Sequence, residues 1–176
     1  MRKLELGSGN RPRAGYEHLD IDPACPDLQY CCSFDSIPVD DNTFDEALSV
    51  HSIEHISWRK TQPTLREWCR VLKPGGKLRI ECPNFRWICK TYLENGEELQ
   101  RDMRSLHPDE KKHLKVKNWR SHTLWANFKM FSSTANGDIH LAGLDAFTLG
   151  HMLEEAGFGS VEVIQDDSTL CLEAYK

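Results

Sequence analysis

The segment LELGSGN, at residues 4–10, constrains the fold more than any other part of the sequence. It has the form of a short apolar strand that carries a carboxylate, Glu5, and breaks at Gly7 and Gly9. Because neither glycine has a Cβ, the backbone of such a turn can approach a ligand closely. The segment therefore predicts a strand and turn that bind a nucleoside.

A second acidic segment, HLDID at residues 18–22, narrows the kind of nucleoside. Asp20 and Asp22 end the next predicted strand, where acidic groups suit the two hydroxyls of a ribose. A dinucleotide-binding turn needs a third glycine, which lets a helix pack closely while its N-terminus holds a pyrophosphate. Pro12 stands at that position, and Glu5 would repel a pyrophosphate but could accept hydrogen bonds from an ammonium group. A cationic, phosphate-free adenosine therefore fits better than a dinucleotide.

Length and composition limit the class of protein. With 176 residues and a net charge of −5, the chain is long enough for one domain with a real core. No apolar run approaches the roughly 20 residues that span a bilayer, and the start of the sequence lacks the apolar core of a signal peptide. The seven cysteines form no CxxC pair, which argues against a disulfide framework and a closed zinc site. We therefore expect a single-domain cytoplasmic protein with reduced, mostly buried thiols and no membrane span.

Apolar runs and turn residues alternate along the chain as in a parallel α/β protein. The pattern predicts strands at 3–6, 17–21, 28–32, 46–50 and 77–83, helices capped by Thr61 and Asp145, and a terminal antiparallel hairpin of 161–165 and 170–175. The connection at 11–16 is too short for a full crossover helix, so we expect a helix of only one or two turns there.

Two further segments carry a resemblance to a known family. VLKPGGKLRIECPN at 71–84 and FDEALSVHSIEHI at 44–56, together with the glycine turn, resemble class I S-adenosylmethionine-dependent methyltransferases of the type 11 group. Within this group, the sequence resembles small predicted bacterial methyltransferases with a His-x-x-Glu-His string after strand four. The resemblance implies a doubly wound, Rossmann-like α/β fold whose seven-stranded, mostly parallel sheet has an antiparallel terminal strand and the order 3-2-1-4-5-7-6. It also implies one methyltransferase domain over 1–176, with 90–139 as a substrate-side insertion or lid.

The same resemblance implies S-adenosyl-L-methionine as the cofactor and assigns residues to it. Glu5, Gly7, Ser8 and Gly9 would line the methionine end, Asp20 would bind the ribose hydroxyls with Asp22 as a substitute, and Phe34 and Asp35 would edge the adenine.

The reaction that we predict is O-methylation of a hydroxyl on a small molecule or glycan. The sulfonium already makes the methyl group electrophilic, so the enzyme must align the acceptor and accept its proton. His51 is the first choice for the proton acceptor, because it directly follows strand four at the crevice of an open parallel sheet. His55 and His140 are the second choices, although His55 could equally pack against or cap the next helix.

Two other functions remain open. The chain could be a catalytically silent module that binds S-adenosylmethionine and serves as a partner or regulator. It could also be a metal-assisted ribose 2′-O-methyltransferase, because His51, Glu54, His55 and the remote His140 resemble the metal-binding Glu-x-x-Glu-His and distant His of those enzymes. Their first ligand is a glutamate where this chain has His51, so we expect no metal.

The middle of the chain should decide the substrate. This segment has basic residues at 111–129 and the aromatics Trp119, Trp125, Phe128 and Phe131. These side chains could bind an anionic or sugar-bearing acceptor through charge and stacking. Alternatively, the segment could form an amphipathic helix whose aromatic face is buried. The overall acidity argues against long nucleic acid as a partner. Cys82, at the end of strand five, is expected to be a buried structural thiol rather than a nucleophile.

Overall fold

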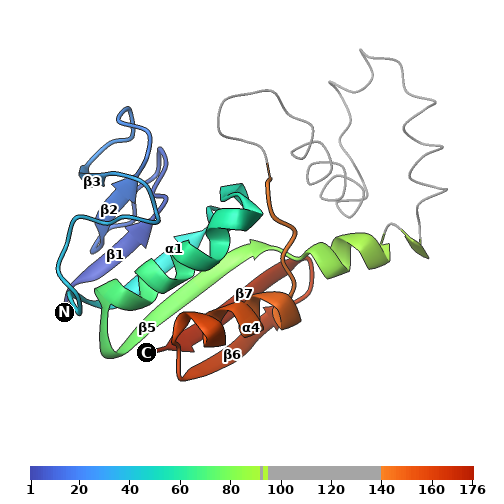
Figure 1. Ribbon diagram of the computed structural model, residues 1–176. Helices are drawn as coiled ribbons and strands as arrows, with labels where there is room; N and C mark the ends of the chain where they lie inside the picture. Colours follow the sequence, from blue (N-terminus) through green and yellow to red (C-terminus); the bar gives the residue numbers. More distant parts are fainter. Residues whose placement is uncertain (92, 95–139) are drawn as a thin grey trace, which may run out of the picture.

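The computed structural model describes residues 1–91, 93–94 and 140–176 and contains one seven-stranded sheet (Figure 1). The strands, in chain order, are β1 (Lys3–Leu6), β2 (Glu17–Asp20), β3 (Leu28–Cys31), β4 (Phe44–Val50), β5 (Leu72–Pro83), β6 (Ser160–Asp166) and β7 (Thr169–Tyr175). The helical elements are the short 3₁₀ helix η1 (Ile53–His55), α1 (Trp58–Val71), a helix at 85–91 and 93–94, and α4 (Ala146–Ala156).

The strand order is β3-β2-β1-β4-β5-β7-β6. Strands β1 to β5 pair in parallel, whereas β7 pairs antiparallel to both β5 and β6. The predicted fold class is therefore confirmed, including the strand order and the reversed terminal strand. The terminal hairpin predicted from 161–165 and 170–175 is also present.

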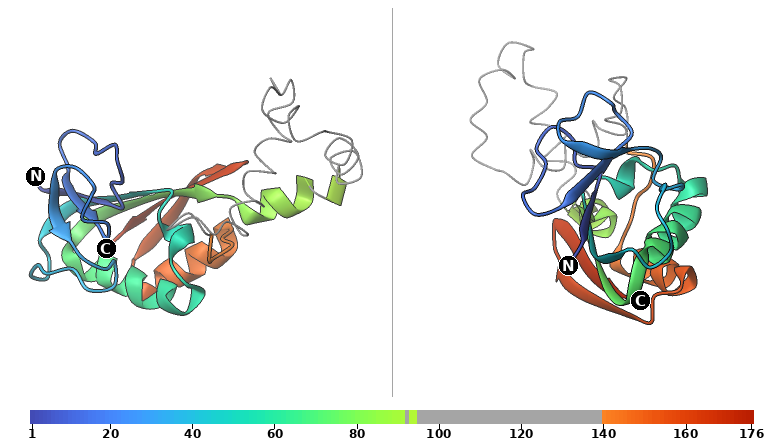
Figure 2. Two further views of the ribbon diagram at one scale, coloured as in Figure 1. Left: turned by 90° about the horizontal axis from the view of Figure 1, so that it is seen from above. Right: turned by 90° about the vertical axis from the view of Figure 1, so that its left-hand side faces the viewer.

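One face of the sheet is apolar and is covered by helices. The strand register aligns a row of buried small and apolar side chains across the central strands, namely Leu4, Ala47, Leu78 and Ala174. Both α1 and α4 lie on one side of the strands (Figure 2, left), and their Trp68 and Leu153 are fully buried in the same core cluster. Burial of a leucine side chain of this kind stabilises the fold by about 1.5–3 kcal/mol.

The opposite face of the sheet carries paired charges. Side chains alternate between faces along a strand, so the neighbours of the apolar row point the other way. Lys3 Nζ lies 3.1 Å from Glu46 Oε2, and Lys77 Nζ and Arg79 Nη1 lie 3.3 and 3.2 Å from Glu173 Oε1. This face can meet water without a covering helix, which agrees with the position of both α1 and α4 on the other side.

Helix α1 begins earlier than the sequence predicted. Thr61 was the expected N-cap, but the helix starts at Trp58, and the backbone N–H groups of Lys60 and Thr61 donate to the carbonyl of Ser57. Pro63 consequently lies inside the helix, where it removes the hydrogen bond to the carbonyl four residues before it and its ring crowds that carbonyl. Strand β5 likewise starts at Leu72 instead of 77, because Leu72 pairs with Phe44 before a shift in register.

Helix α4 has the predicted ends. The carboxylate of Asp145 accepts a hydrogen bond from the backbone N–H of Thr148 at 2.7 Å, as an N-cap should. Gly157 ends the helix in the left-handed region at φ 109°. The connection between β1 and β2 is short, as expected, but it contains only turns and bends and not the one or two helical turns that the sequence predicted.

The predicted lid at 90–139 falls largely at residue 92 and residues 95–139, which lie outside the described part of the chain, as do the basic and aromatic residues named for it. Among the described helices, none has the length and apolar character needed to cross a membrane.

Candidate active site

The glycine turn after β1 is closely packed on one side. Gly7 has φ +79°, and its backbone N–H donates to the carbonyl of Leu19 at 2.8 Å. A Cβ at Gly7 would lie 2.3 Å from Oγ of Ser52, and this hydroxyl donates to the carbonyl of Leu6 at 2.9 Å. The first residue after His51 therefore joins the turn to the end of β4. Sequence reasoning gave no role to Ser52.

The other side of the turn is open and polar. A Cβ at Gly9 would have no neighbour within 4 Å among the described residues. Ser8 is buried, and its hydroxyl has no hydrogen-bond partner in the described part of the chain. A buried hydroxyl without a partner is costly, and a polar ligand at the turn would supply the missing hydrogen bond. The turn therefore fits the polar methionine end of the predicted cofactor.

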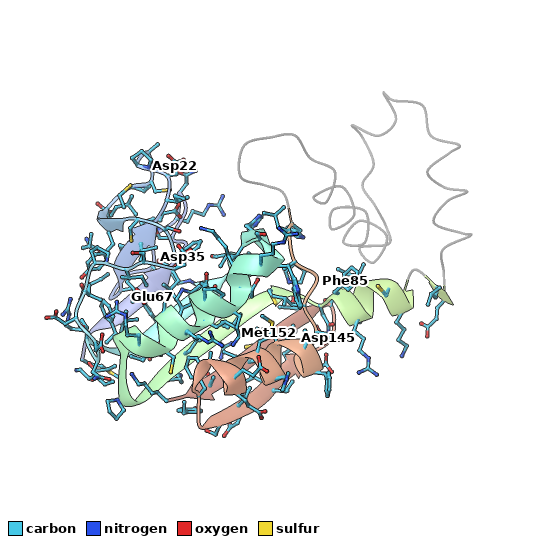
Figure 3. All side chains as sticks on the ribbon, viewed as in Figure 1. Asp22, Asp35, Glu67, Phe85, Asp145 and Met152 are labelled. Atoms are coloured by element: carbon cyan, nitrogen blue, oxygen red, sulfur yellow. The ribbon has the colours of Figure 1, made fainter. Side chains whose placement is uncertain are left out.

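Asp20 contacts the turn, whereas Asp22 does not. Asp20 Oδ2 accepts a hydrogen bond from the backbone N–H of Gly9 at 2.9 Å, and its Oδ1 accepts from the N–H of Asp22 at 3.0 Å. Asp22 itself is exposed in the loop after β2 (Figure 3), where its side chain accepts from the N–H of Ala24. The structure thus brings the first of these two predicted ribose-binding carboxylates to the turn.

Glu5 is buried and already has protein partners. Its Oε2 accepts a hydrogen bond from the backbone N–H of Arg13 at 2.8 Å and lies 3.0 Å from Nδ1 of His18. Its Oε1 lies 3.3 Å from Nε of Arg13. A ligand ammonium would share the carboxylate with these groups. Sequence reasoning assigned no role to Arg13 or His18, although both lie within the segments it used.

Phe34 reaches the glycine turn and Asp35 faces α1. Cζ of Phe34 lies 3.3 Å from the position of a Cβ on Gly7, and its ring meets Trp68 edge to face with centroids 6.1 Å apart. Asp35 Oδ2 lies 3.0 Å from Nζ of Lys60. Hydrogen bonds from Ser33 and Lys60 hold the pKa of Asp35 below its usual value. Of the two predicted adenine-edge residues, Phe34 therefore lies at the turn.

His51 directly follows β4 and has an unusual backbone conformation. Its φ of +51° lies in the left-handed region, which costs a residue with a Cβ about 1–2 kcal/mol. Its side chain is 57% exposed, and Nδ1 lies 3.2 Å from Oε1 of the buried Glu54. The hydrogen bond with Glu54 raises the pKa of His51. Backbone strain of this kind occurs most often at functional sites.

His55 and His140 meet although they are far apart in the sequence. Their rings are 5.1 Å apart between centroids, at an angle of 75°. His140 is buried, and this burial lowers its pKa. The backbone N–H groups of Leu141 and Ala142 donate to the carbonyl of Glu54 at 2.7 and 3.1 Å, which holds this segment against η1.

Glu54 connects the three histidines that were predicted as proton acceptors. One oxygen contacts His51, and one ligand-type atom from each of Glu54, His55 and His140 lies within 4.8 Å of the others. His51 is not a member of that group of three. The sequence named Glu54 only within a possible metal set, and its tertiary contacts show that it is central to the cluster.

Cys82 is fully buried at the carboxyl end of β5, and burial strongly raises the pKa of its thiol. Its burial agrees with the expectation of a structural thiol, because the thiolate is the nucleophilic form of cysteine.

Comparisons with known proteins agree with this geometry. Residues 13–80, fewer than half of the chain, match the family model of the methyltransferase domain. No curated protein sequence matches the chain.

Solved structures of methyltransferases share the fold over nearly the whole chain. A Thermotoga maritima S-adenosylmethionine-dependent methyltransferase, described as a possible histamine N-methyltransferase, is 14% identical with a TM-score of 0.65, and the match covers 99% of this chain and 82% of that one. An S-adenosylmethionine-dependent methyltransferase from Archaeoglobus fulgidus is 12% identical with a TM-score of 0.61 and coverages of 99% and 86%. Phosphoethanolamine N-methyltransferase 2 from Haemonchus contortus, in complex with phosphomonomethylethanolamine and S-adenosylhomocysteine, is 15% identical with a TM-score of 0.57 and coverages of 100% and 49%.

At these identities the solved structures show the fold, and the family model adds the sequence pattern of a methyltransferase domain. The closer resemblance to bacterial proteins with a His-x-x-Glu-His string stays a prediction. The domain at residues 13–80 and the fold of the whole chain together support an S-adenosylmethionine-dependent methyltransferase with S-adenosylmethionine as its cofactor.

Proposed function

We propose that the protein transfers the methyl group of S-adenosylmethionine to a hydroxyl of a small molecule or glycan, with His51 as the proton acceptor. The observation that carries this proposal is the placement of His51. It lies directly after β4 in a left-handed conformation, its side chain is exposed, and the buried carboxylate of Glu54 holds its Nδ1. An open parallel sheet presents its ligand-binding residues at this carboxyl edge.

The glycine turn and its neighbours hold the cofactor in this proposal. Bound there, S-adenosylmethionine supplies an electrophilic methyl group on its sulfonium. Glu5 and the three residues of the turn line the methionine end, and the partnerless hydroxyl of Ser8 and the open space at Gly9 support that placement. Asp20 binds the ribose and Phe34 borders the adenine, with Asp22 and Asp35 at the periphery of the pocket.

His51 has the hydrogen-bond geometry of a general base. When Nδ1–H donates to Glu54, the proton-accepting lone pair is on Nε2, the nitrogen that this contact leaves available. Glu54 is a positioning residue here, because it orients the imidazole without touching the substrate. The exposure of the His51 side chain allows an acceptor hydroxyl to reach it. His55 and His140 stay second choices for the proton acceptor.

The segment at 90–139 is proposed to cover this acceptor within a single domain of residues 1–176. The described residues that flank it support the placement. Asn84 and Leu144 form a parallel bridge, and the backbone N–H of Phe85 donates to the carbonyl of Leu144 at 2.9 Å. The two flanks therefore meet just beyond the carboxyl end of β5, the edge of the sheet that also presents His51.

Cofactor binding tests the first half of the proposal. S-adenosylhomocysteine should raise the melting temperature of the protein, whereas NAD should not, because the turn lacks the third glycine and carries Glu5. A melting curve that S-adenosylhomocysteine leaves unchanged would rule out the cofactor site.

Methyl transfer tests the second half. Protein incubated with methyl-labelled S-adenosylmethionine and a panel of glycans and small alcohols should form a labelled methyl ether. Such an ether resists mild alkali, which releases the methyl group of an ester. A protein that binds S-adenosylhomocysteine but labels no acceptor in the panel would favour the silent binding module instead.

A further inference from the structure

Glu54, His55 and His140 converge from two distant parts of the chain. One nitrogen or oxygen atom from each side chain lies within 4.8 Å of the other two. A transition-metal ion with bonds of about 2.1 Å in a tetrahedral arrangement holds its ligand atoms about 3.4 Å apart. Metal binding would therefore have to draw these atoms somewhat closer together than they lie in this structure. From this convergence we propose that Glu54, His55 and His140 bind one divalent transition-metal ion of the zinc type.

The surroundings of Glu54 suit a bound cation. Glu54 is only 2% exposed, and its Oε1 contacts His51. Its Oε2 is buried and has no hydrogen-bond partner among the described residues. A buried carboxylate oxygen without a partner is energetically costly. A dication bound to Oε2 removes this cost, and it leaves the contact between Oε1 and His51 in place.

Backbone hydrogen bonds hold η1 and the segment that follows His140 close together. The carbonyl of Glu54 accepts hydrogen bonds from the N–H groups of Leu141 and Ala142, which fixes residue 140 beside η1. The bridge between Asn84 and Leu144 attaches the same segment to the end of β5. A metal site is strong when its ligands are fixed before the ion arrives, because binding then costs little ordering entropy.

The ligand types select the class of ion. Two imidazoles and one carboxylate suit Zn²⁺, Co²⁺, Ni²⁺ and Fe²⁺, whereas Mg²⁺ and Ca²⁺ prefer oxygen ligands alone. Three protein ligands leave at least one coordination position open for water or a substrate oxygen. The set differs from the four-residue pattern considered from the sequence, because His51 is outside it. The inference goes beyond the proposed methyl transfer and does not depend on it.

Metal titration of the whole chain tests the site directly. Protein stripped with a chelator is titrated with Co²⁺, whose visible absorption reports nitrogen and oxygen ligation, and with Zn²⁺ in competition. We expect one equivalent of Co²⁺ to bind, Zn²⁺ to displace it, and Mg²⁺ to have no effect. Loss of a residue that only hydrogen-bonds to a metal ligand weakens metal binding by about 10–100-fold. The His140→Ala and Glu54→Gln variants should weaken Co²⁺ binding by more than this, because each removes a ligand itself.

His151→Ala is the matched control. His151 lies on α4 with Nε2 3.3 Å from Glu155 Oε1, and both side chains are more than half exposed. This surface pair resembles the site in chemistry but lacks its burial and its third ligand, so the variant should bind one equivalent as the wild type does.

Circular dichroism separates loss of the site from loss of the fold, and Glu54→Gln preserves the size of the side chain. Binding of Co²⁺ with equal affinity by the wild type and a folded Glu54→Gln or His140→Ala protein would overturn the proposal, as would a wild type that binds no Co²⁺. Because neither acceptor nor S-adenosylmethionine is present, failure here leaves the proposed methyl transfer standing.

Discussion

The glycine turn and the histidine cluster lie at the same edge of the sheet but are built differently. The turn consists of residues close together in the sequence, and its backbone N–H groups donate to the carbonyl of Leu19 and to the carboxylate of Asp20, which holds its shape. The cluster joins η1 to residue 140, and its shape depends on side chains that meet only after the sheet has formed. We therefore expect the structure of the turn to be disturbed when a side chain is added, and the structure of the cluster to be disturbed when a side chain is removed.

This difference separates two kinds of function. A turn of bare backbone offers space and N–H groups, which suits binding and placement of a ligand. A buried carboxylate among imidazoles offers proton transfer and metal ligation. Substitutions in the turn should therefore change cofactor affinity and stability, and substitutions at His51 should change the rate of methyl transfer.

The largest expected effect is on the rate of reaction. His51→Ala should lower the rate of methyl transfer to a hydroxyl acceptor by about 10²–10⁴-fold, the usual contribution of a general base. The affinity for S-adenosylhomocysteine, measured by calorimetry, should stay within about twofold, because His51 lies outside the glycine turn. His151→Ala should change neither value. Full activity in His51→Ala would show that another group accepts the proton.

Gly7→Ala should destabilise the protein strongly. The new Cβ would lie 2.3 Å from Oγ of Ser52, and the positive φ adds strain. Overpacking costs about 1–3 kcal/mol and a left-handed conformation about 1–2 kcal/mol, so the free energy of unfolding should fall by about 2–5 kcal/mol. Chemical denaturation measures this change.

Gly9→Ala is the control, because its φ is also positive but its Cβ would meet no described atom within 4 Å. Its free energy of unfolding should fall only by the cost of the left-handed conformation, about 1–2 kcal/mol. Equal losses in Gly7→Ala and Gly9→Ala would mean that the contact with Ser52 does not limit the turn.

Removal of the Ser52 side chain should rescue part of the Gly7 defect. Ser52→Gly removes both the Oγ and the Cβ that crowd a side chain at position 7. In the Gly7→Ala background it should recover about 1–3 kcal/mol of the overpacking cost, although the same change alone destabilises the wild type by removing the hydrogen bond to Leu6. A double-mutant cycle measures this coupling, and strictly additive effects would contradict it.

The smallest effect concerns the pH dependence of stability at Asp35. The pKa of Asp35 is lower in the folded protein than its usual value, because Ser33 and Lys60 donate hydrogen bonds to the carboxylate. Its stabilisation is therefore complete above the unfolded pKa of about 3.9 and is lost as the pH falls through the lower folded pKa.

The matched variant for this effect is Asp35→Asn. It should cost at most about 1 kcal/mol at neutral pH, because Lys60 is largely exposed, and the difference from the wild type should shrink as the pH falls below about 4. Denaturant titrations of both proteins at several pH values check this, and a difference that grows toward acid pH would have the wrong sign.

Most of the fold could be predicted because its signals are local. Asp145 and Gly157 mark the ends of α4 through a cap and a left-handed residue, and the structure has both. The start of α1 was wrong by one turn, because a proline in the second turn costs one hydrogen bond and does not set the first residue of a helix. The early start of β5 depends on the pairing of Leu72 with Phe44 across the sheet, which no local pattern reveals.

The site was predictable to a smaller extent. Gly7, Gly9 and Asp20 were named from the sequence, and the structure brings them together. Asp22 was named with them, but it lies in an exposed loop, because β2 ends at Asp20 and the side chain of Asp22 accepts a hydrogen bond from Ala24 within that loop. The partners of Glu5 were missed, since the sequence shows that a buried carboxylate is present but not which cations and donors surround it.

The sequence by itself determined most strands, the caps of α4 and the glycine turn, because hydrophobic periodicity, caps and glycines act over a few residues. The strand order was implied by the resemblance to a methyltransferase family and did not follow from these local patterns. Only the tertiary structure decided that Ser52 closes the turn and that Glu54 connects His51, His55 and His140. The physical reason is that hydrogen bonding and burial of polar side chains depend on neighbours that the folded chain brings together, whatever their separation in the sequence.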